Sequence, residues 1–136
     1  MYNEAISNNC NLLNDNFHIV CGKIVNENEM TDWFDIRSLD KDQRQWLQQD
    51  IERMVRVPNV LNTIPCEIDL LILDGGEFST YKEWLLLKDR TRYVVMDDTL
   101  TLKCTRIRRE ILKNPNYKVL ADDLTERNGY LVTQLR

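Results

Sequence analysis

Glycine is scarce in this chain of 136 residues, which contains only Gly22, Gly75, Gly76 and Gly129. Neither the GxGxxG pattern of dinucleotide-binding loops nor the GxxxxGKS/T pattern of P-loops occurs anywhere in the sequence. The sequence therefore excludes a glycine-rich loop that binds phosphate groups through its backbone. A nucleotide-like cofactor would have to be held by a different arrangement of residues.

Zinc-binding patterns are also missing. His18 is the only histidine, and the four cysteines are far apart, with no CxxC pair. Structural zinc sites need four closely spaced Cys or His ligands, so this spacing argues against one. We expect Cys10, Cys21, Cys66 and Cys104 to be reduced thiols that are either buried as small hydrophobic side chains or inert, and His18 to be a packed or surface residue.

Long apolar runs are absent as well. The longest, IDLLIL and WLLL, are far shorter than the roughly 18 residues that a membrane-spanning helix needs. The N-terminal sequence also lacks the charged start and apolar centre of a signal peptide. The 18 Lys and Arg against 22 Asp and Glu leave a net charge of −4. We therefore expect a cytoplasmic protein with no membrane partner and no general attraction to nucleic acid.

One segment departs from this acidic balance. Between residues 100 and 113 the chain carries five basic residues, namely Lys103, Arg106, Arg108, Arg109 and Lys113. Charges on an amphipathic helix are most often solvated, and no aromatic residues are interleaved here to stack on bases. We interpret these residues as a solvated helix face, and a nucleic-acid partner is not expected.

The composition, 43% hydrophobic and 29% charged, is typical of one folded domain, which we expect to span residues 1–136. Apolar runs bounded by turn residues predict strands at 17–25, 68–73, 92–96, 117–121 and 130–135. Helical periodicity predicts helices at 2–14, between the capping residue Asp40 and Pro58, after Gly76 with Thr80 and Glu83 as a capping box, and at 100–113.

The order of these elements predicts the fold class. Strands that alternate with helices indicate an α/β protein with a mostly parallel sheet and helices on both faces. The last two strands are joined without a helix, so one of them should be antiparallel and lie at or near an edge.

Acidic residues follow two consecutive predicted strands. Asp74 comes directly after the apolar run 68–73, and Asp97 and Asp98 come directly after 92–96. Ligands of open α/β sheets bind beyond the carboxyl ends of the strands, where these side chains would converge. Three close carboxylates need a counter-charge, and Mg²⁺ prefers such oxygen ligands. The alternative is that these aspartates start a turn and cap a helix, roles in which Asp is common.

These motifs resemble a known family. LLILDGG, YVVMDDT and the terminal NGYLVTQLR look like the second half of class I S-adenosylmethionine-dependent methyltransferases, most closely the metal-dependent O-methyltransferases. The resemblance implies an incomplete Rossmann-like sheet without the first two strands of the fold, with an antiparallel last strand. It also implies that Asp74, Asp97 and Asp98 bind Mg²⁺, which orients the acceptor oxygens.

The resemblance implies further roles for three residues. Gly22 and Lys23 are similar to the loop on the adenine side of the family's cofactor, which makes them the candidate S-adenosylmethionine-binding residues. Glu77 stands where related enzymes commonly have Lys or His, and a carboxylate can act as a general base if burial raises its pKa. The alternative for Glu77 is a solvent-exposed or helix-capping side chain. The glycine-rich cofactor loop and the acid that binds the ribose have no counterpart in this sequence.

Two functions follow from these observations. One is metal-assisted methyl transfer from S-adenosylmethionine to the oxygen of a small-molecule acceptor. The other is a catalytically inactive methyltransferase-like remnant that works as a binding or assembly module. Without the first two strands of the fold, the apolar strand 68–73 would be an uncovered edge, so we expect a homo-oligomer or a partner chain that covers it.

Overall fold

The computed structural model describes residues 20–136 and shows an α/β fold of three α-helices and one four-stranded mixed sheet in this part of the chain. The α/β class predicted from the sequence is therefore confirmed. The predicted helix 2–14, His18 and the first part of the predicted strand 17–25 lie outside the described residues. Within the described part, no helix combines the length and the apolar character needed to cross a membrane.

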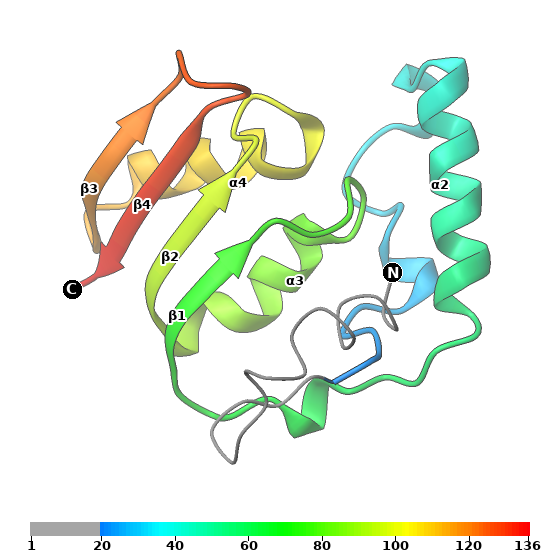
Figure 1. Ribbon diagram of the computed structural model, residues 1–136, viewed down its shortest axis with the longest axis horizontal. Helices are drawn as coiled ribbons and strands as arrows, with labels where there is room; N and C mark the ends of the chain where they lie inside the picture. Colours follow the sequence, from blue (N-terminus) through cyan, green and yellow to red (C-terminus); the bar gives the residue numbers. More distant parts are fainter. Residues whose placement is uncertain (1–19) are drawn as a thin grey trace, which may run out of the picture.

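The sheet consists of β1 (Ile68–Leu73), β2 (Thr91–Asp97), β3 (Tyr117–Asp123) and β4 (Tyr130–Leu135), in the order β1-β2-β4-β3 (Figure 1). All four correspond to predicted strands. β1 and β2 pair in parallel, whereas β4 is antiparallel to both β2 and β3. The predicted antiparallel strand near the C-terminus is therefore present, one position in from the edge.

The prediction of a mostly parallel sheet needs correction at the level of strand pairs, since only β1 and β2 form a parallel pair. The physical reason is the short connection between β3 and β4, which permits only an antiparallel hairpin. Because β4 also inserts beside β2, it contributes two antiparallel pairings. The strand β3 nevertheless runs in the same direction as β1 and β2, since β4 opposes all of them.

The capping residues and bounds predicted for the helices agree with the structure only in part. Helix α2 (Lys41–Met54) begins at Asp40, whose carboxylate accepts a hydrogen bond of 2.8 Å from the Gln43 backbone, as the capping box predicts. Helix α3 (Thr80–Leu87) does not use the predicted capping box, because its N-cap is Ser79 and the Thr80 hydroxyl donates to the Gly76 carbonyl instead. Helix α4 (Leu102–Lys113) matches the predicted helix 100–113 closely.

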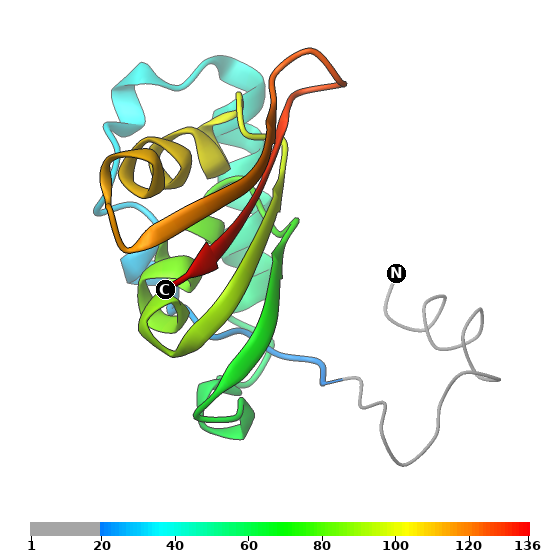
Figure 2. The ribbon, with the colours of Figure 1, turned by 90° about the vertical axis from the view of Figure 1, so that its left-hand side faces the viewer.

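The main core lies between the sheet and the pair α3 and α4, which both lie on one side of the sheet (Figure 2). The buried residues of α4 are Cys104, Ile107 and Ile111 beside Lys103, and they pack with Val94 of β2 and other core residues. A second cluster of buried residues lies under α2 and joins that helix to the start of α3. It comprises Val25, Met30, Leu39, Leu47 and Phe78.

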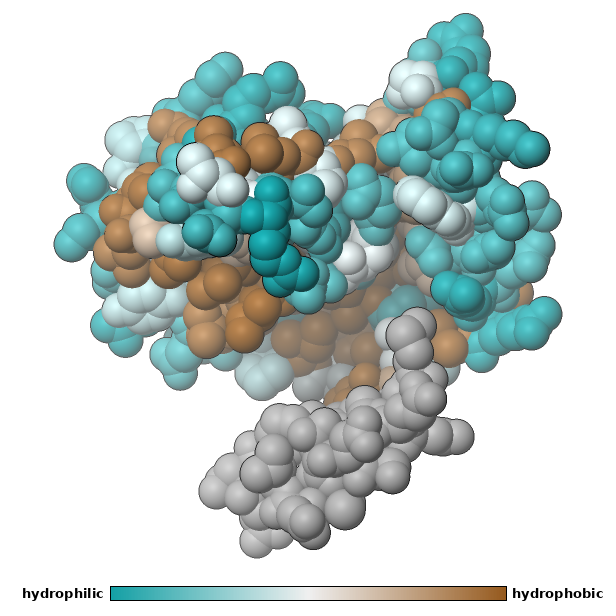
Figure 3. Space-filling view, turned by 45° about the horizontal axis from the view of Figure 1, so that its top comes forward, coloured by the Kyte–Doolittle hydropathy of each residue, from teal (hydrophilic) through white to brown (hydrophobic). Residues whose placement is uncertain are grey.

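The opposite face of the sheet is not covered by any helix of the described residues, so the prediction of helices on both faces is wrong for this part of the chain (Figure 2). Leu70 and Ile72 of β1 point to this side and are 52% and 63% exposed. Tyr93, Val95 and Val132 continue the same face on β2 and β4. We call these five residues the open sheet face; apolar side chains gather over the strands in Figure 3.

The predicted strand 17–25 does not form in its described part. Residues 20–25 have one isolated bridge, between Lys23 and Asn59, in place of a strand. Its two hydrogen bonds run from the Lys23 amide to the Pro58 carbonyl and from the Val60 amide to the Lys23 carbonyl, at 2.9 and 2.8 Å. An apolar run indicates a strand only when a sheet edge is available to pair with it, and this segment pairs with a loop.

The cysteine predictions are partly confirmed. Cys104 is a free thiol that is completely buried, as expected for a small hydrophobic side chain. Cys21 and Cys66 are also free thiols, but both are exposed, so burial does not apply to them and their inertness stays a prediction. Cys10 lies outside the described residues.

Candidate functional site

Three aspartates converge at the carboxyl ends of β1 and β2, as the sequence predicted. Asp74 follows the last residue of β1, Asp97 ends β2, and Asp98 comes next. The strands pair in parallel up to Leu73 and Met96, so their ends lie side by side. One carboxylate oxygen from each aspartate lies within 4.8 Å of the others.

The backbone around Asp98 fixes this arrangement. Asp98 has a φ angle of 56°, in the left-handed region that aspartate and asparagine tolerate better than most residues. Its amide donates to Asp97 Oδ1 at 2.9 Å, and Asn128 Nδ2 donates to Asp98 Oδ1 at 2.9 Å. The Thr101 amide also donates to the Asp98 carbonyl at 3.0 Å. The turn between β2 and α4 therefore holds the Asp98 carboxylate toward the strand ends.

Lys103, in the first turn of α4, reaches into the three carboxylates. Its Nζ lies 3.1 Å from Asp74 Oδ1 and 2.9 Å from Asp98 Oδ2, and its side chain is only 7% exposed. The hydrogen bond from Lys103, followed by that from Asn128, lowers the pKa of Asp98. Burial alone would lower the pKa of Lys103, but its hydrogen bonds to Asp98 and Asp74 outweigh that effect and raise it.

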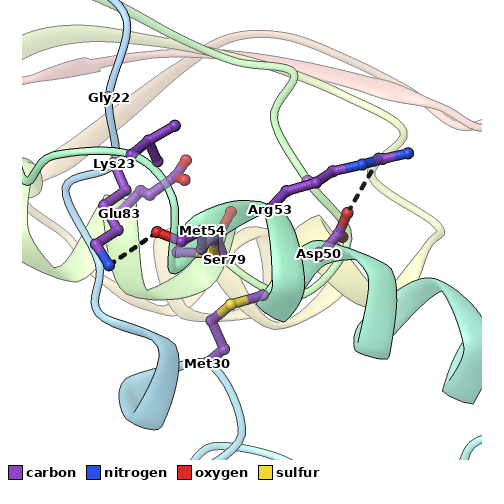
Figure 4. Close-up of a pocket in the computed structure, with 10 residues that line it drawn as sticks. Gly22, Lys23, Met30, Asp50, Arg53, Met54, Ser79 and Glu83 are labelled. Carbon is purple, nitrogen blue, oxygen red and sulfur yellow. Dashed lines mark hydrogen bonds and ion pairs between the residues drawn. The ribbon is translucent and has the colours of Figure 1, made fainter.

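A pocket of about 250 Å³ lies beside the loop that follows β1 (Figure 4). Its lining comes from several separate segments of the chain and includes Gly22, Lys23, Asp50, Met54, Gly76 and Glu83. The predicted cofactor residues therefore do lie together at a pocket near the carboxyl end of β1. The sequence did not indicate that α2 and α3 would supply the other walls.

Two carboxyl groups in this pocket have altered acidity. Burial raises the pKa of Glu83, opposed by a hydrogen bond with the Ser79 side chain. Burial also raises the pKa of Asp50, opposed by the charge of Arg53, whose Nη1 lies 3.6 Å from Asp50 Oδ1. The pocket is thus lined by two carboxyl groups that ionise less readily than usual.

No family model, curated protein or solved structure matches this chain. The functional interpretation therefore depends on the residues and their geometry.

The three aspartates lie close enough together to hold a divalent metal, but basic side chains already pair with them, so a metal would have to compete with Lys103. Mg²⁺ needs carboxylate oxygens that are free to coordinate it at about 2.0–2.1 Å. Here Asp74 and Asp98 already accept the Lys103 ammonium, and Arg127 Nη1 lies 3.5 Å from Asp97 Oδ2. The counter-charge that the sequence led us to expect from a metal is supplied by the protein itself.

The pocket does not fit S-adenosylmethionine well either. Its volume of about 250 Å³ is below the roughly 300–1,000 Å³ of typical small-molecule sites. A Cβ atom on Gly22 would lie 2.3 Å from Val60 Cγ1, so this glycine is needed for close packing against the loop at 58–60. The Lys23 ammonium pairs with Glu27 and donates to the Met54 carbonyl at 2.9 Å. Both predicted cofactor residues therefore have structural roles.

The predicted general base, Glu77, lies half-buried in the loop between β1 and α3. The pKa of the Cys104 thiol is raised mainly by burial, and the charges of Asp98, Glu77 and Asp74 add to that rise while the charge of Lys103 opposes it. Together these effects bring the pKa of Cys104 to about 12. A catalytic role for Glu77 stays a prediction.

Lys103 is the important residue that the sequence interpretation misplaced, since it was assigned to a solvated helix face. A signal for its burial was present. Lys103, Ile107 and Ile111 are spaced by four residues, so they lie on the same face of the helix, and that face packs on the core.

Proposed function

We propose that this chain is a methyltransferase-like binding and assembly module, and that it associates with a second copy of itself through the open sheet face. The observation that carries the proposal is the exposure of Leu70 and Ile72 on a sheet face that no described helix covers. Contiguous apolar surface of this kind marks interaction sites in folded proteins.

The open sheet face suits a second copy because it is apolar and regular. The register places Leu70 opposite Tyr93, Ile72 opposite Val95, and Val95 opposite Val132. The five residues therefore form aligned rows across three strands, and none of them carries a charge. Because these five residues are uncharged, they do not repel the same residues of a second copy. A two-fold axis would place the open sheet faces of the two copies against each other.

The size of the sheet predicts how tight this association is. The three strands that carry the open sheet face, about 4.8 Å apart and about six residues long, present roughly 15 by 20 Å, and two such faces packed together bury on the order of 600 Å² in total. Stable interfaces usually bury more than about 1,200 Å². We therefore expect a weak dimer with a Kd in the micromolar range.

Two features of the candidate site favour this module over metal-assisted methyl transfer. The Lys103 ammonium lies among the three aspartates that the resemblance assigns to Mg²⁺. The pocket beside Gly22 and Lys23 is small, and both residues have structural roles there. The remnant interpretation requires neither a metal nor an enclosed cofactor.

Sedimentation velocity over a wide concentration range tests the proposal. Wild-type protein should shift from monomer to dimer across the micromolar range, and Ile72→Lys should remain a monomer. Val55→Lys is the matched control, because Val55 lies at the end of α2 and is 65% exposed, close to the 63% of Ile72. Circular dichroism verifies that both variants fold. A wild type that stays monomeric throughout, or an equal effect of both substitutions, would overturn the proposal.

A second candidate, cofactor-dependent methyl transfer, is favoured by the position of the pocket near the carboxyl end of β1, where open α/β sheets bind ligands. Calorimetric titration with S-adenosylhomocysteine tests it directly. Asp50 lines the pocket, so saturable heat that Asp50→Leu abolishes, in a variant that remains folded, would support the cofactor site. An absence of heat would argue against it and leave the assembly module.

A further inference from the structure

The acidic cluster contains its own cation. Three carboxylates within 4.8 Å of one another would repel strongly if nothing lay between them. The Lys103 ammonium is within hydrogen-bond distance of two of them, at 2.9 and 3.1 Å. It is therefore placed where a bound cation would otherwise balance the same charges.

The fold holds this ammonium in position. Lys103 belongs to the buried face of α4, together with Cys104, Ile107 and Ile111, and its side chain is only 7% exposed. Because the amine is tethered to the same molecule, it competes with a free ion at a high effective concentration. Mg²⁺ must also lose part of its hydration shell before it binds carboxylates. Both effects favour the lysine over the metal.

We infer that Lys103 is the resident cation of the Asp74, Asp97 and Asp98 cluster, that it keeps divalent metals out, and that removing its amine creates a metal site. The cluster then acts as an ionic clasp that ties the ends of β1 and β2 to the start of α4. The acidic cluster and Lys103 share no residue with the open sheet face. This inference therefore stands or falls independently of self-association.

Isothermal titration calorimetry with MnCl₂ tests the inference, with Lys103→Met as the variant. Methionine retains an unbranched apolar stem and lacks the charge. Lys113→Met is the control, because Lys113 is an exposed lysine on the same helix. We expect Lys103→Met to bind Mn²⁺ at least about tenfold more tightly than wild type and the control, a difference of about 1.4 kcal/mol. Adding Asp97→Asn to Lys103→Met should weaken that binding again.

Several results would overturn the inference. One is that wild type binds Mn²⁺ as tightly as Lys103→Met, which would mean that the ammonium does not exclude the metal. Another is that folded Lys103→Met binds no Mn²⁺ at all. If Lys103→Met does not fold in chelator, Lys103→Gln replaces it, and thermal unfolding with and without Mn²⁺ becomes the readout. A melting temperature that rises with Mn²⁺ in the variant only supports the inference, and equal shifts in variant and wild type contradict it.

Discussion

Replacing Lys103 with methionine should destabilise the fold, and the structure sets the size of the effect. The lysine side chain is 7% exposed, while Asp98 is 24% and Asp74 is 64% exposed. Removing one partner of a fully buried ion pair costs about 3–5 kcal/mol, whereas an exposed pair contributes about 0–1 kcal/mol. The ion pair with Asp98 should contribute an energy between these limits, and the ion pair with Asp74 an energy near the lower limit. We therefore expect Lys103→Met to lower the free energy of unfolding by about 2 kcal/mol.

Urea unfolding followed by circular dichroism measures this loss. For a small domain with an m-value of about 2 kcal/mol/M, the midpoint should fall by about 1 M urea. Lys113→Met serves as the control and should change stability by no more than about 0.5 kcal/mol. A Lys103→Met variant within about 0.5 kcal/mol of wild type, or no less stable than the control, would refute the ionic clasp as a stabilising contact.

The pH dependence of the same variant follows from the pKa of Asp98, which lies below its ordinary 3.8 mainly because Lys103 donates a hydrogen bond to it. A carboxyl with a lowered pKa in the folded state stabilises the fold above its unfolded pKa. That contribution is lost as the pH falls through the folded pKa. The difference in the free energy of unfolding between wild type and Lys103→Met should therefore be largest near neutral pH and become smaller in strong acid.

Three further predictions concern other parts of the molecule. Iodoacetamide should alkylate Cys66 in the folded protein but not Cys104, whose pKa burial raises to about 12; equal rates in peptide mass spectrometry would contradict this. Burial raises the pKa of Glu83 above its ordinary 4.5, so stability should fall as the pH rises beyond that value, and Glu83→Gln should be more stable than wild type near neutral pH but not in acid, as judged by urea unfolding. Gly129→Ala should cost about 1–3 kcal/mol in the same assay, because Gly129 has a φ of +81° and a Cβ would lie 2.5 Å from the Thr99 hydroxyl oxygen. Gly76→Ala, whose Cβ would lie 3.3 Å from the Ser79 hydroxyl oxygen, should cost clearly less.

The strands and the acidic cluster were predictable because their signals are local. The run 68–73 and the run before Asp97 are apolar segments that end at acidic residues, and parallel pairing alone brings those ends together. The cap at Asp40 is likewise encoded within four residues. In each case the residues that determine the structure are close in sequence or related by a simple rule of sheet geometry.

Features that depend on distant partners were not predictable. The segment 20–25 is apolar enough for a strand, but it pairs with the loop at 58–60 and adds nothing to the sheet. The apolar run of β1 suggested burial on both faces, yet Leu70 and Ile72 are exposed, because an apolar sequence does not reveal whether a second layer is present. The pocket walls from α2 and α3 gave no recognisable pattern either.

The cation that balances the acidic cluster was also not predicted from the sequence. The sequence suggested that three carboxylates need a cation, and this physical requirement holds. It did not suggest which cation, since Lys103 was counted among the solvated basic residues. The spacing of Lys103 with Ile107 and Ile111 places it on the buried face, where its charge has to be paired.

Self-association through the open sheet face is tested most directly by isotope-filtered nuclear Overhauser spectroscopy on an equal mixture of ¹³C-labelled and unlabelled protein, at a concentration well above the expected micromolar Kd. The module predicts intermolecular signals from methyl groups of Leu70, Ile72, Val95 and Val132, which form the open sheet face. An absence of such signals, or intermolecular signals only from Leu112 on α4, would contradict it.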